Sequence, residues 1–341
     1  MIGLDFGSDT MKVALVAPGA PLEIVTNFQS KRKTPTAVTF YRGERMFGAD
    51  SMALITRKPD LSFARIYRVL GKSIGNPSVE QMKKDYFPYE IYANETTGST
   101  CIKQEETYYT PEELMAMMMQ HAKDMTANYG GKQIKDCVIT VPAHFTQHER
   151  RALYSAADIA NLRVLSLIEE NTAAALHYGI DRVFEQPKTI LYYNMGASAV
   201  QVSVVTYNSY VTKEAGKNKT IGQFEVVGKG WDENIGGFNF DVKLAELLAE
   251  RFNEVWSKKK SYIKGDKVQA HNGPMTRLRT QATKVKEVLS ANPEFPVKIE
   301  QLWKDIDLST KVSRAEFEEA CADLFAMITA PIDAALANAG M

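Results

Sequence analysis

Two stretches of this chain follow the same plan, and they lie roughly 190 residues apart. The first, IGLDFGSDTMKVALV, begins at Ile2, and the second, ILYYNMGASAVQVSVV, begins at Ile190. In each, an apolar strand is followed by a polar residue, one spacer, a glycine, three small or polar residues and a second apolar strand. This repeat indicates a duplicated strand–turn–strand unit. It predicts two α/β lobes that each open with a glycine-containing hairpin.

The first hairpin on its own permits two interpretations. An ordinary hairpin needs only the glycine in its turn, with aspartates as common turn residues. A phosphate site needs a glycine that lets backbone N–H groups approach an anion, hydroxyl donors, and an acid that holds hydrated Mg²⁺. The stretch contains all of these: Gly7, Ser8, Thr10 and Asp5. The second hairpin favours the phosphate site, because two facing hairpins can grip a polyphosphate from both sides.

The composition is ordinary for a globular protein, with 45% hydrophobic and 24% charged residues among 341. The 41 basic and 41 acidic side chains balance, so no broad basic surface for nucleic acid is predicted. No apolar run approaches a membrane span, and we expect no signal peptide because residue 2 already begins the first strand. We therefore expect neither nucleic acid nor a membrane as partner. Cys101, Cys137 and Cys321 are odd in number and far apart, which argues against disulfides and zinc.

Hydrophobic periodicity predicts the remaining helices and strands. Thr146 and Glu149 fit a capping box that starts a helix. His144 and His148 beside it are therefore not predicted to bind metal. The segment LRVLSLI is expected to be a buried strand, and a third glycine turn, Gly236-Gly237, is expected to open a helix. Helices are expected over residues 49–58, 63–72, 111–130, 172–178, 237–256, 275–292 and 313–338. The polar segment GIDRVFEQPK predicts a boundary between lobe I (1–185) and lobe II (186–341).

Four segments carry a resemblance to a known family: IGLDFGSDTMKVALV, VITVPAHFTQHERRAL, LIEENTAAALHYG and IGGFNFD. They resemble the nucleotide-binding domain of the seventy-kilodalton heat-shock proteins, in order along nearly the whole chain. The resemblance implies an α/β, two-lobed, actin-like ATPase fold with duplicated phosphate hairpins. In the family another glycine-rich segment follows the last helix seen here. The C-terminal part of lobe II is thus expected to be missing and the chain to be a fragment.

Further segments, including KRKTPTAVTF and SRAEFEEACADLF, resemble the large 110- and 170-kDa branch of the family, most closely its endoplasmic-reticulum members. That resemblance implies a holdase and nucleotide exchange factor whose partner is a conventional seventy-kilodalton chaperone. Unfolded client proteins would bind through domains that lie outside this chain. The implied location is the endoplasmic-reticulum lumen, with the cytoplasm as the alternative.

The resemblance also implies the site residues and the cofactors, ATP or ADP with Mg²⁺. Asp5 matches the acid that orients hydrated Mg²⁺, and Glu170 matches an acid that helps to hold metal-bound water. The matches to nucleotide-binding positions are Gly7, Ser8, Asp9 and Thr10 in the first phosphate turn, Gly236 and Gly237 in the second lobe, and Lys286 and Ser290 beside the nucleoside.

Several positions depart from the family pattern. The catalytic lysine falls on Tyr67, and the acid of the second hairpin falls on Asn194. Of the following turn, Gly196 is kept, whereas Ala197, Ser198 and Ala199 replace glycines and a threonine. Asp9 stands where the family has a hydroxyl, and Thr283 and Glu287 replace an acid and a base near the nucleoside. Single electrostatic donors are worth about 10²–10³ in rate, so we expect weak or absent hydrolysis.

Two alternatives stay open at this point. The chain can be a working ATPase chaperone of the conventional type. It can also be a small-molecule kinase of the same superfamily, although no segment offers the base that an acceptor hydroxyl requires. Nucleotide affinity, client specificity and oligomeric state are not predicted by the sequence.

Overall fold

The computed structural model describes residues 1–19, 21–131, 133–214 and 217–341. Its first large unit is a six-stranded sheet in the order β12-β11-β1-β2-β3, with β4 also paired to β2. Strand β1 lies parallel to β11 and antiparallel to β2, so the first predicted hairpin forms the middle of this sheet. The strands are β1 (Ile2–Phe6), β2 (Thr10–Leu15), β3 (Glu23–Ile24), β4 (Thr34–Pro35), β11 (Asp136–Val141) and β12 (Arg163–Glu169).

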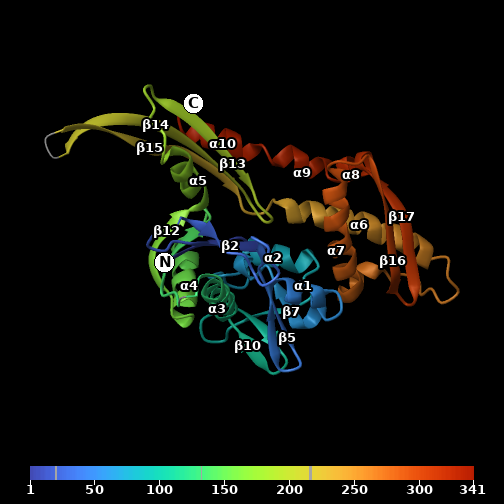
Figure 1. The fold of residues 1–341 in the computed structure, drawn as a ribbon. Coiled ribbons are helices and arrows are strands. Elements are labelled where there is room, and N and C mark those ends of the chain that lie inside the picture. The colour runs from blue at the N-terminus through green and yellow to red at the C-terminus, as the bar shows by residue number, and fades with distance from the viewer. Residues whose placement is uncertain (20, 132, 215–216) are drawn as a thin grey trace.

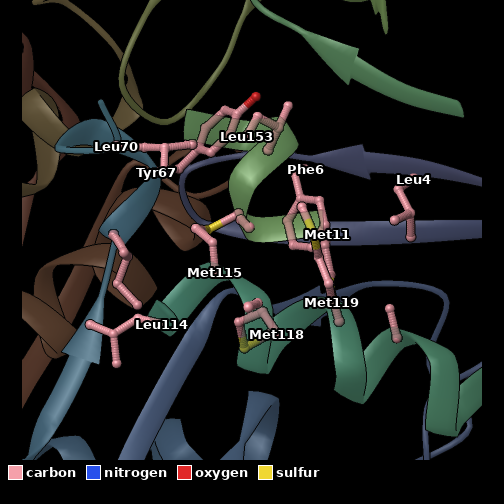
Figure 2. Packing of buried hydrophobic residues seen from close by; sticks show 14 of the residues in the cluster. Leu4, Phe6, Met11, Tyr67, Leu70, Leu114, Met115, Met118, Met119 and Leu153 are labelled. Atoms are coloured by element: carbon pink, nitrogen blue, oxygen red, sulfur yellow. The ribbon is translucent and has the colours of Figure 1, made fainter. Parts of the chain in front are cut away.

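Helices α3 (Pro111–Gly130) and α4 (Gln147–Ile159) pack together beside this sheet (Figure 1). Each begins with a capping box, formed by Thr110 with Glu113 and by Thr146 with Glu149, so the helix start predicted at residue 146 is confirmed. Figure 2 shows the methionines of α3 packed against the side chains of the first hairpin. Packing in this cluster holds β1 and β2 against α3.

Smaller elements surround this unit (Figure 1). Two three-stranded sheets have the orders β6-β5-β7 and β10-β9-β8. Their strands are β5 (Ala37–Tyr41), β6 (Glu44–Phe47), β7 (Ser62–Ala64), β8 (Ile91–Ala93), β9 (Thr100–Gln104) and β10 (Thr107–Tyr109), and the helices nearby are α1 (Gly48–Ile55) and α2 (Pro77–Lys84).

The second predicted hairpin belongs to a separate three-stranded sheet, in the order β13-β14-β15. Its strands are β13 (Lys188–Met195), β14 (Val200–Glu214) and β15 (Lys217–Asp232), and α5 (Glu170–Gly179) precedes them. Strands β14 and β15 run well past β13 as a long two-stranded ribbon (Figure 1). Helix α10 (Ala330–Asn338) crosses β15, where a side chain at Gly228 would lie 2.2 Å from the Ala335 carbonyl oxygen. Only glycine permits that approach.

The last unit contains α6 (Gly237–Trp256) and α7 (Asn272–Leu289), packed on the hairpin of β16 (Glu294–Trp303) and β17 (Ile306–Ser313). Trp256, Phe252 and Leu278 lie in its hydrophobic core. Both helices begin and end within a few residues of their predicted bounds. Helix α6 leaves directly from the turn after β15, which places its first residues beside the second hairpin (Figure 1).

Three sequence predictions are wrong in detail. Residues 63–72 form no α-helix, because residues 62–64 pair with β5 and Arg65 has a left-handed backbone (φ 62°), after which 66–68 form one 3₁₀ turn. The residues of strand β12 are exposed or half-buried rather than buried, because it is the edge strand of its sheet. Residues 313–338 are three helices, α8 (Arg314–Ala320), α9 (Ala322–Met327) and α10, not one. The boundary at residues 185–186 stays a prediction.

In the described part of the chain, no single helix has the length and apolar character of a membrane span, although α8 with the segment Ala322–Asn338 passes that test as a pair bent by 63°.

Candidate functional site

The two hairpins meet at their turns. The hydroxyl oxygens of Ser8 and Ser198 lie 2.7 Å apart and share a hydrogen bond. Within the first turn the Gly7 N–H donates to the Thr10 carbonyl at 3.0 Å, and within the second the Gly196 N–H donates to the Ala199 carbonyl at 2.9 Å. The repeat seen in the sequence is therefore a repeat of turn geometry, and the two copies face each other.

The start of α6 is bound to the second turn. The N–H groups of Gly237 and Phe238 donate to the carbonyls of Gly196 and Ala197, both at 2.9 Å. A side chain at Gly236 would lie 2.5 Å from the Ala197 carbonyl, so glycine is needed for this close approach. The predicted glycine pair thus supports the hairpin. The Gly237 N–H already has a protein acceptor in place of a phosphate oxygen.

Glu170 accepts two hydrogen bonds from the second hairpin and is affected by the charge of Asp5 in the first hairpin. Asn194 of β13 and Gln201 of β14 donate to its Oε2 atom, at 3.1 and 2.8 Å. Burial, and then the nearby charge of Asp5, raise the pKa of Glu170 to about 7, although the two amide donors oppose the rise. Glu170 is the first residue of α5, directly after β12, and this position brings it beneath both turns. The structure therefore brings together the predicted Asp5, Glu170 and Asn194.

The carboxylates present fit a magnesium ion held largely through water. Asp5 accepts a hydrogen bond from Thr140 at 2.9 Å and pairs with Lys12 at 3.3 Å, yet its side chain is 47% exposed. Mg²⁺ commonly binds one or two carboxylates together with substrate phosphates and keeps several waters. Asp5 and Glu170 are the two carboxylates that this site offers. Among the described residues no three histidine, cysteine or acidic side chains form a complete metal cage.

Tyr67 stands where the resemblance places a lysine. Its ring lies in the hydrophobic cluster and contacts Phe145, and its hydroxyl points away from Met115 (Figure 2). That hydroxyl is buried and has no hydrogen-bond partner among the described residues. Burial, followed by the charges of Glu170 and Asp5, raises the pKa of Tyr67 well above its usual value. Tyr67 is therefore neutral, and the charges of the same two carboxylates act on it.

Asp9 is compensated by an arginine that the sequence analysis did not single out. The guanidinium of Arg65 lies 3.1 Å from the Asp9 carboxylate and stacks 3.7 Å from the centre of the Phe238 ring on α6. The left-handed backbone of Arg65 directs the chain toward this contact. The repulsion that a carboxylate at position 9 would exert on phosphate is therefore reduced.

Beside the hairpins lies a cleft of about 710 Å³, a volume in the range of small-molecule sites. Lys286 lines it, and its ammonium contacts Asp241 at 2.6 Å and the Gly237 carbonyl at 2.9 Å. Thr283 and Glu287 lie on the same wall. The exposed Ser290, at the end of α7, is not part of the lining. The other residues of the predicted site on the lining are Ser8, Asp9, Gly196, Ala197 and Gly237.

A smaller cavity of about 90 Å³ lies beneath the turns, and it contains a cation that sequence reasoning missed. Lys72 is only 7% exposed and its ammonium is 2.9 Å from the Glu233 carboxylate. The segment YRVLGK ends at this lysine, so a comparison of every basic residue in that segment could have found it. Gln201 carried no sequence signal, because its role depends on contact with Glu170.

Comparison with known proteins identifies the class to which this fold and site belong. A model of the Hsp70 protein family matches residues 1–341, so the chain belongs to the Hsp70 family. The predicted fold is confirmed as the actin-like ATPase fold of that family's nucleotide-binding domain.

Similar proteins include hypoxia up-regulated protein 1 of Danio rerio, 40% identical over 345 residues, and the proteins of the same name from Xenopus tropicalis (38% identical) and Homo sapiens (36% identical). Each match covers 100% of this chain, and it covers 34%, 52% and 34% of the relative, respectively. The chain therefore spans about a third to a half of the length of these curated relatives. The predicted resemblance to the endoplasmic-reticulum 170-kDa members of the large branch is confirmed.

Proposed function

We propose that this chain is the ATP-binding domain of a large heat-shock co-chaperone, with a hydrolytic site that is degenerate. One observation carries the proposal: two hairpins of the same turn geometry meet through Ser8 and Ser198 beside a cleft large enough for a nucleotide. Lys286 on the wall of that cleft offers a cation to the ligand, and the Lys286–Asp241 contact holds it in place. Asp5 and Glu170 would hold the Mg²⁺ that accompanies the phosphates.

Weak hydrolysis follows from the residues around Glu170. Asn194 is neutral and donates to Glu170, whereas an aspartate there would add a third carboxylate to organise the metal and its waters. Tyr67 is neutral and cannot offset negative charge that develops on the terminal phosphate. We expect nucleotide to bind and to be cleaved slowly.

The co-chaperone role is proposed from the relatives as well as from the site. A domain that binds nucleotide but cleaves it slowly is suited to docking on a conventional seventy-kilodalton chaperone and promoting release of that partner's nucleotide. Holdase activity toward unfolded clients would reside in parts of the protein outside this chain. The similarity to hypoxia up-regulated protein 1 supports the endoplasmic-reticulum lumen as the location.

Two measurements test this proposal. Calorimetric titration with ADP and Mg²⁺ should show binding that Lys286→Met weakens. Lys243→Met should leave it unchanged, because Lys243 pairs with Asp323 at 2.8 Å and does not line the cleft. Adding the protein to a conventional chaperone loaded with fluorescent ADP should speed release of that nucleotide. A chain that binds no nucleotide, or that leaves the partner's release rate unaltered, would refute the corresponding half of the proposal.

A further inference from the structure

The small cavity beneath the hairpins is built for a polar occupant. Tyr67 and His144 are among the residues that line it. The Tyr67 hydroxyl and the Nδ1 atom of His144 are both buried without a hydrogen-bond partner among the described residues. Native structures leave few such atoms unpaired, and a polar group bound in this cavity would give both atoms a partner. A volume of about 90 Å³ exceeds what one water requires and accommodates a tetrahedral oxyanion.

Lys72 supplies this cavity with its positive charge. Its side chain is buried and reaches the cavity wall, whereas its partner Glu233 is 37% exposed. Burial opposes the charge of Glu233, but the hydrogen bond and charge of Lys72, with His144 nearby, hold the pKa of Glu233 below its usual value. A buried ammonium needs a counter-charge, and here the counter-charge is a partly exposed side chain.

The Lys72–Glu233 pair also joins distant parts of the chain. Glu233 lies in the turn between β15 and α6, 161 residues from Lys72. Next to it the Ser78 hydroxyl donates to Asn234 at 3.3 Å. These contacts tie the segment after β7 to the segment that carries the second hairpin and α6. If another anion replaced Glu233 as the partner of Lys72, one of the contacts between these two segments would therefore be lost.

The cavity and the nucleotide cleft share part of their lining. Both are lined by Ser8, Gly196 and Ala197, the turn residues of the two hairpins. A polyphosphate that lies in the cleft with its end between the turns, once the Ser8–Ser198 hydrogen bond opens, presents its last phosphate to the cavity. A diphosphate bound in the same position would end before it reached the cavity.

We propose that Lys72 binds the terminal phosphate of a nucleoside triphosphate, and that this phosphate replaces Glu233 as the partner of the buried ammonium. This inference rests on the proposed nucleotide binding. No bond is made or broken: one anion replaces another on the same cation. Lysine acts toward phosphate as a compact point charge, so the exchange needs no new side-chain geometry. The domain would distinguish a triphosphate from a diphosphate by binding alone, and would report the difference through release of Glu233.

Calorimetry with ADP and with the non-hydrolysable β,γ-imido analogue of ATP tests this role. In Lys72→Met we expect affinity for the analogue to fall about tenfold or more, and affinity for ADP to change less than about threefold. Glu233→Gln removes the charged partner of Lys72 and should therefore increase affinity for the analogue. Lys286→Met should weaken both ligands alike, and Lys243→Met neither. Because Lys72→Met leaves Glu233 unpaired, the double variant Lys72→Met, Glu233→Gln and thermal melts of each protein report on folding.

The outcomes separate the two proposals. Equal loss of both nucleotides in a folded Lys72→Met protein, or no loss of the analogue, would overturn the role of Lys72 while leaving nucleotide binding intact. A wild-type protein that binds neither nucleotide would reject the proposed function, and with it this inference. A Glu233→Gln protein that binds the analogue less tightly than wild type would show that Glu233 is not the group displaced.

Discussion

The first hairpin lies in the middle of a six-stranded sheet, whereas the second begins on the edge strand of a three-stranded sheet. Leu4 on β1 is 1% exposed, but Leu191 on β13 is 37% exposed. The turns themselves are alike, since each is closed by an N–H of glycine that donates to the carbonyl three residues on. The comparison teaches that a turn can be preserved by its backbone while its surroundings and its chemistry diverge.

The two hairpins differ in the side chain that stands two residues before the turn glycine. The first hairpin keeps Asp5, whose charge raises the pKa of Glu170, and the second has Asn194, whose amide donates to Glu170 and opposes that rise. One copy thus acts on the shared carboxylate as an anion and the other as a neutral donor. The site is asymmetric although its scaffold is repeated.

The largest expected difference concerns stability. Leu4→Ala should lower the free energy of unfolding by about 2–5 kcal/mol, because it opens a cavity in a fully packed core. Leu191→Ala, the same substitution in the second hairpin but two positions further from the turn glycine, should cost about 1 kcal/mol or less, since the side chain already meets solvent. Urea unfolding of both variants measures the two values, and similar losses would mean that the hairpins are equally buried.

The next difference concerns pH. The folded pKa of Glu170, about 7, exceeds the ordinary glutamate value of 4.5, so the folded state holds this proton more tightly than the unfolded state. Stability is therefore greatest below pH 4.5 with respect to this group, and is lost as pH rises to about 7, by at most about 3 kcal/mol.

Glu170→Gln should remove this slope, as measured by unfolding at pH 5 and pH 7.5. The two hairpins should act in opposite directions on it. Asp5→Asn lowers the pKa of Glu170 by removing a like charge, and Asn194→Asp raises it by replacing a donor with a charge. A slope that is unchanged in Glu170→Gln would show that another group titrates.

The smallest expected difference concerns the turn glycines. A side chain at Gly7 would lie 2.8 Å from the Thr10 carbonyl oxygen, a backbone atom, whereas at Gly196 the nearest such atom is the Ala199 carbonyl oxygen at 3.5 Å. Gly7→Ala should therefore destabilise by about 1–3 kcal/mol, and Gly196→Ala by about 0.5 kcal/mol or less. Thermal melts of the two variants compare them, and equal shifts would mean that both turns are equally tight.

The sequence predicts both hairpins and several helices well, because local patterns determine them. Thr146 and Glu149 specify a helix start within four residues, and Gly236-Gly237 opens α6 where expected. Local patterns do not predict secondary structure that depends on contacts with residues distant in the sequence. Residues 63–72 look helical, but pairing of β7 with β5 and the left-handed Arg65 break the helix. The exposure of β12 depends on its place at a sheet edge, which periodicity does not encode.

The candidate site shows the same division. Asp5, Glu170 and Asn194 could be placed by the motifs around them, and the structure brings them together. Lys72 could be found as a basic residue of YRVLGK, but its pairing with Glu233 could not be predicted, because Glu233 is 161 residues away. Arg65 likewise gains meaning only through Asp9 and Phe238. Contacts of this kind depend on the packing of two halves of the molecule, and a single sequence does not specify it.

The central claim is that the second hairpin keeps the turn but has lost hydrolytic chemistry. Single-turnover ATP hydrolysis tests it most directly, with wild type compared with the Asn194→Asp, Tyr67→Lys double variant and with a conventional seventy-kilodalton chaperone. The new lysine would lie near Glu170 and Asp5, whose charges already act on the Tyr67 position. We expect wild type to be much slower than the conventional chaperone, and the double variant to be about 10²-fold faster than wild type. Wild-type hydrolysis as fast as that of the conventional chaperone would contradict the claim.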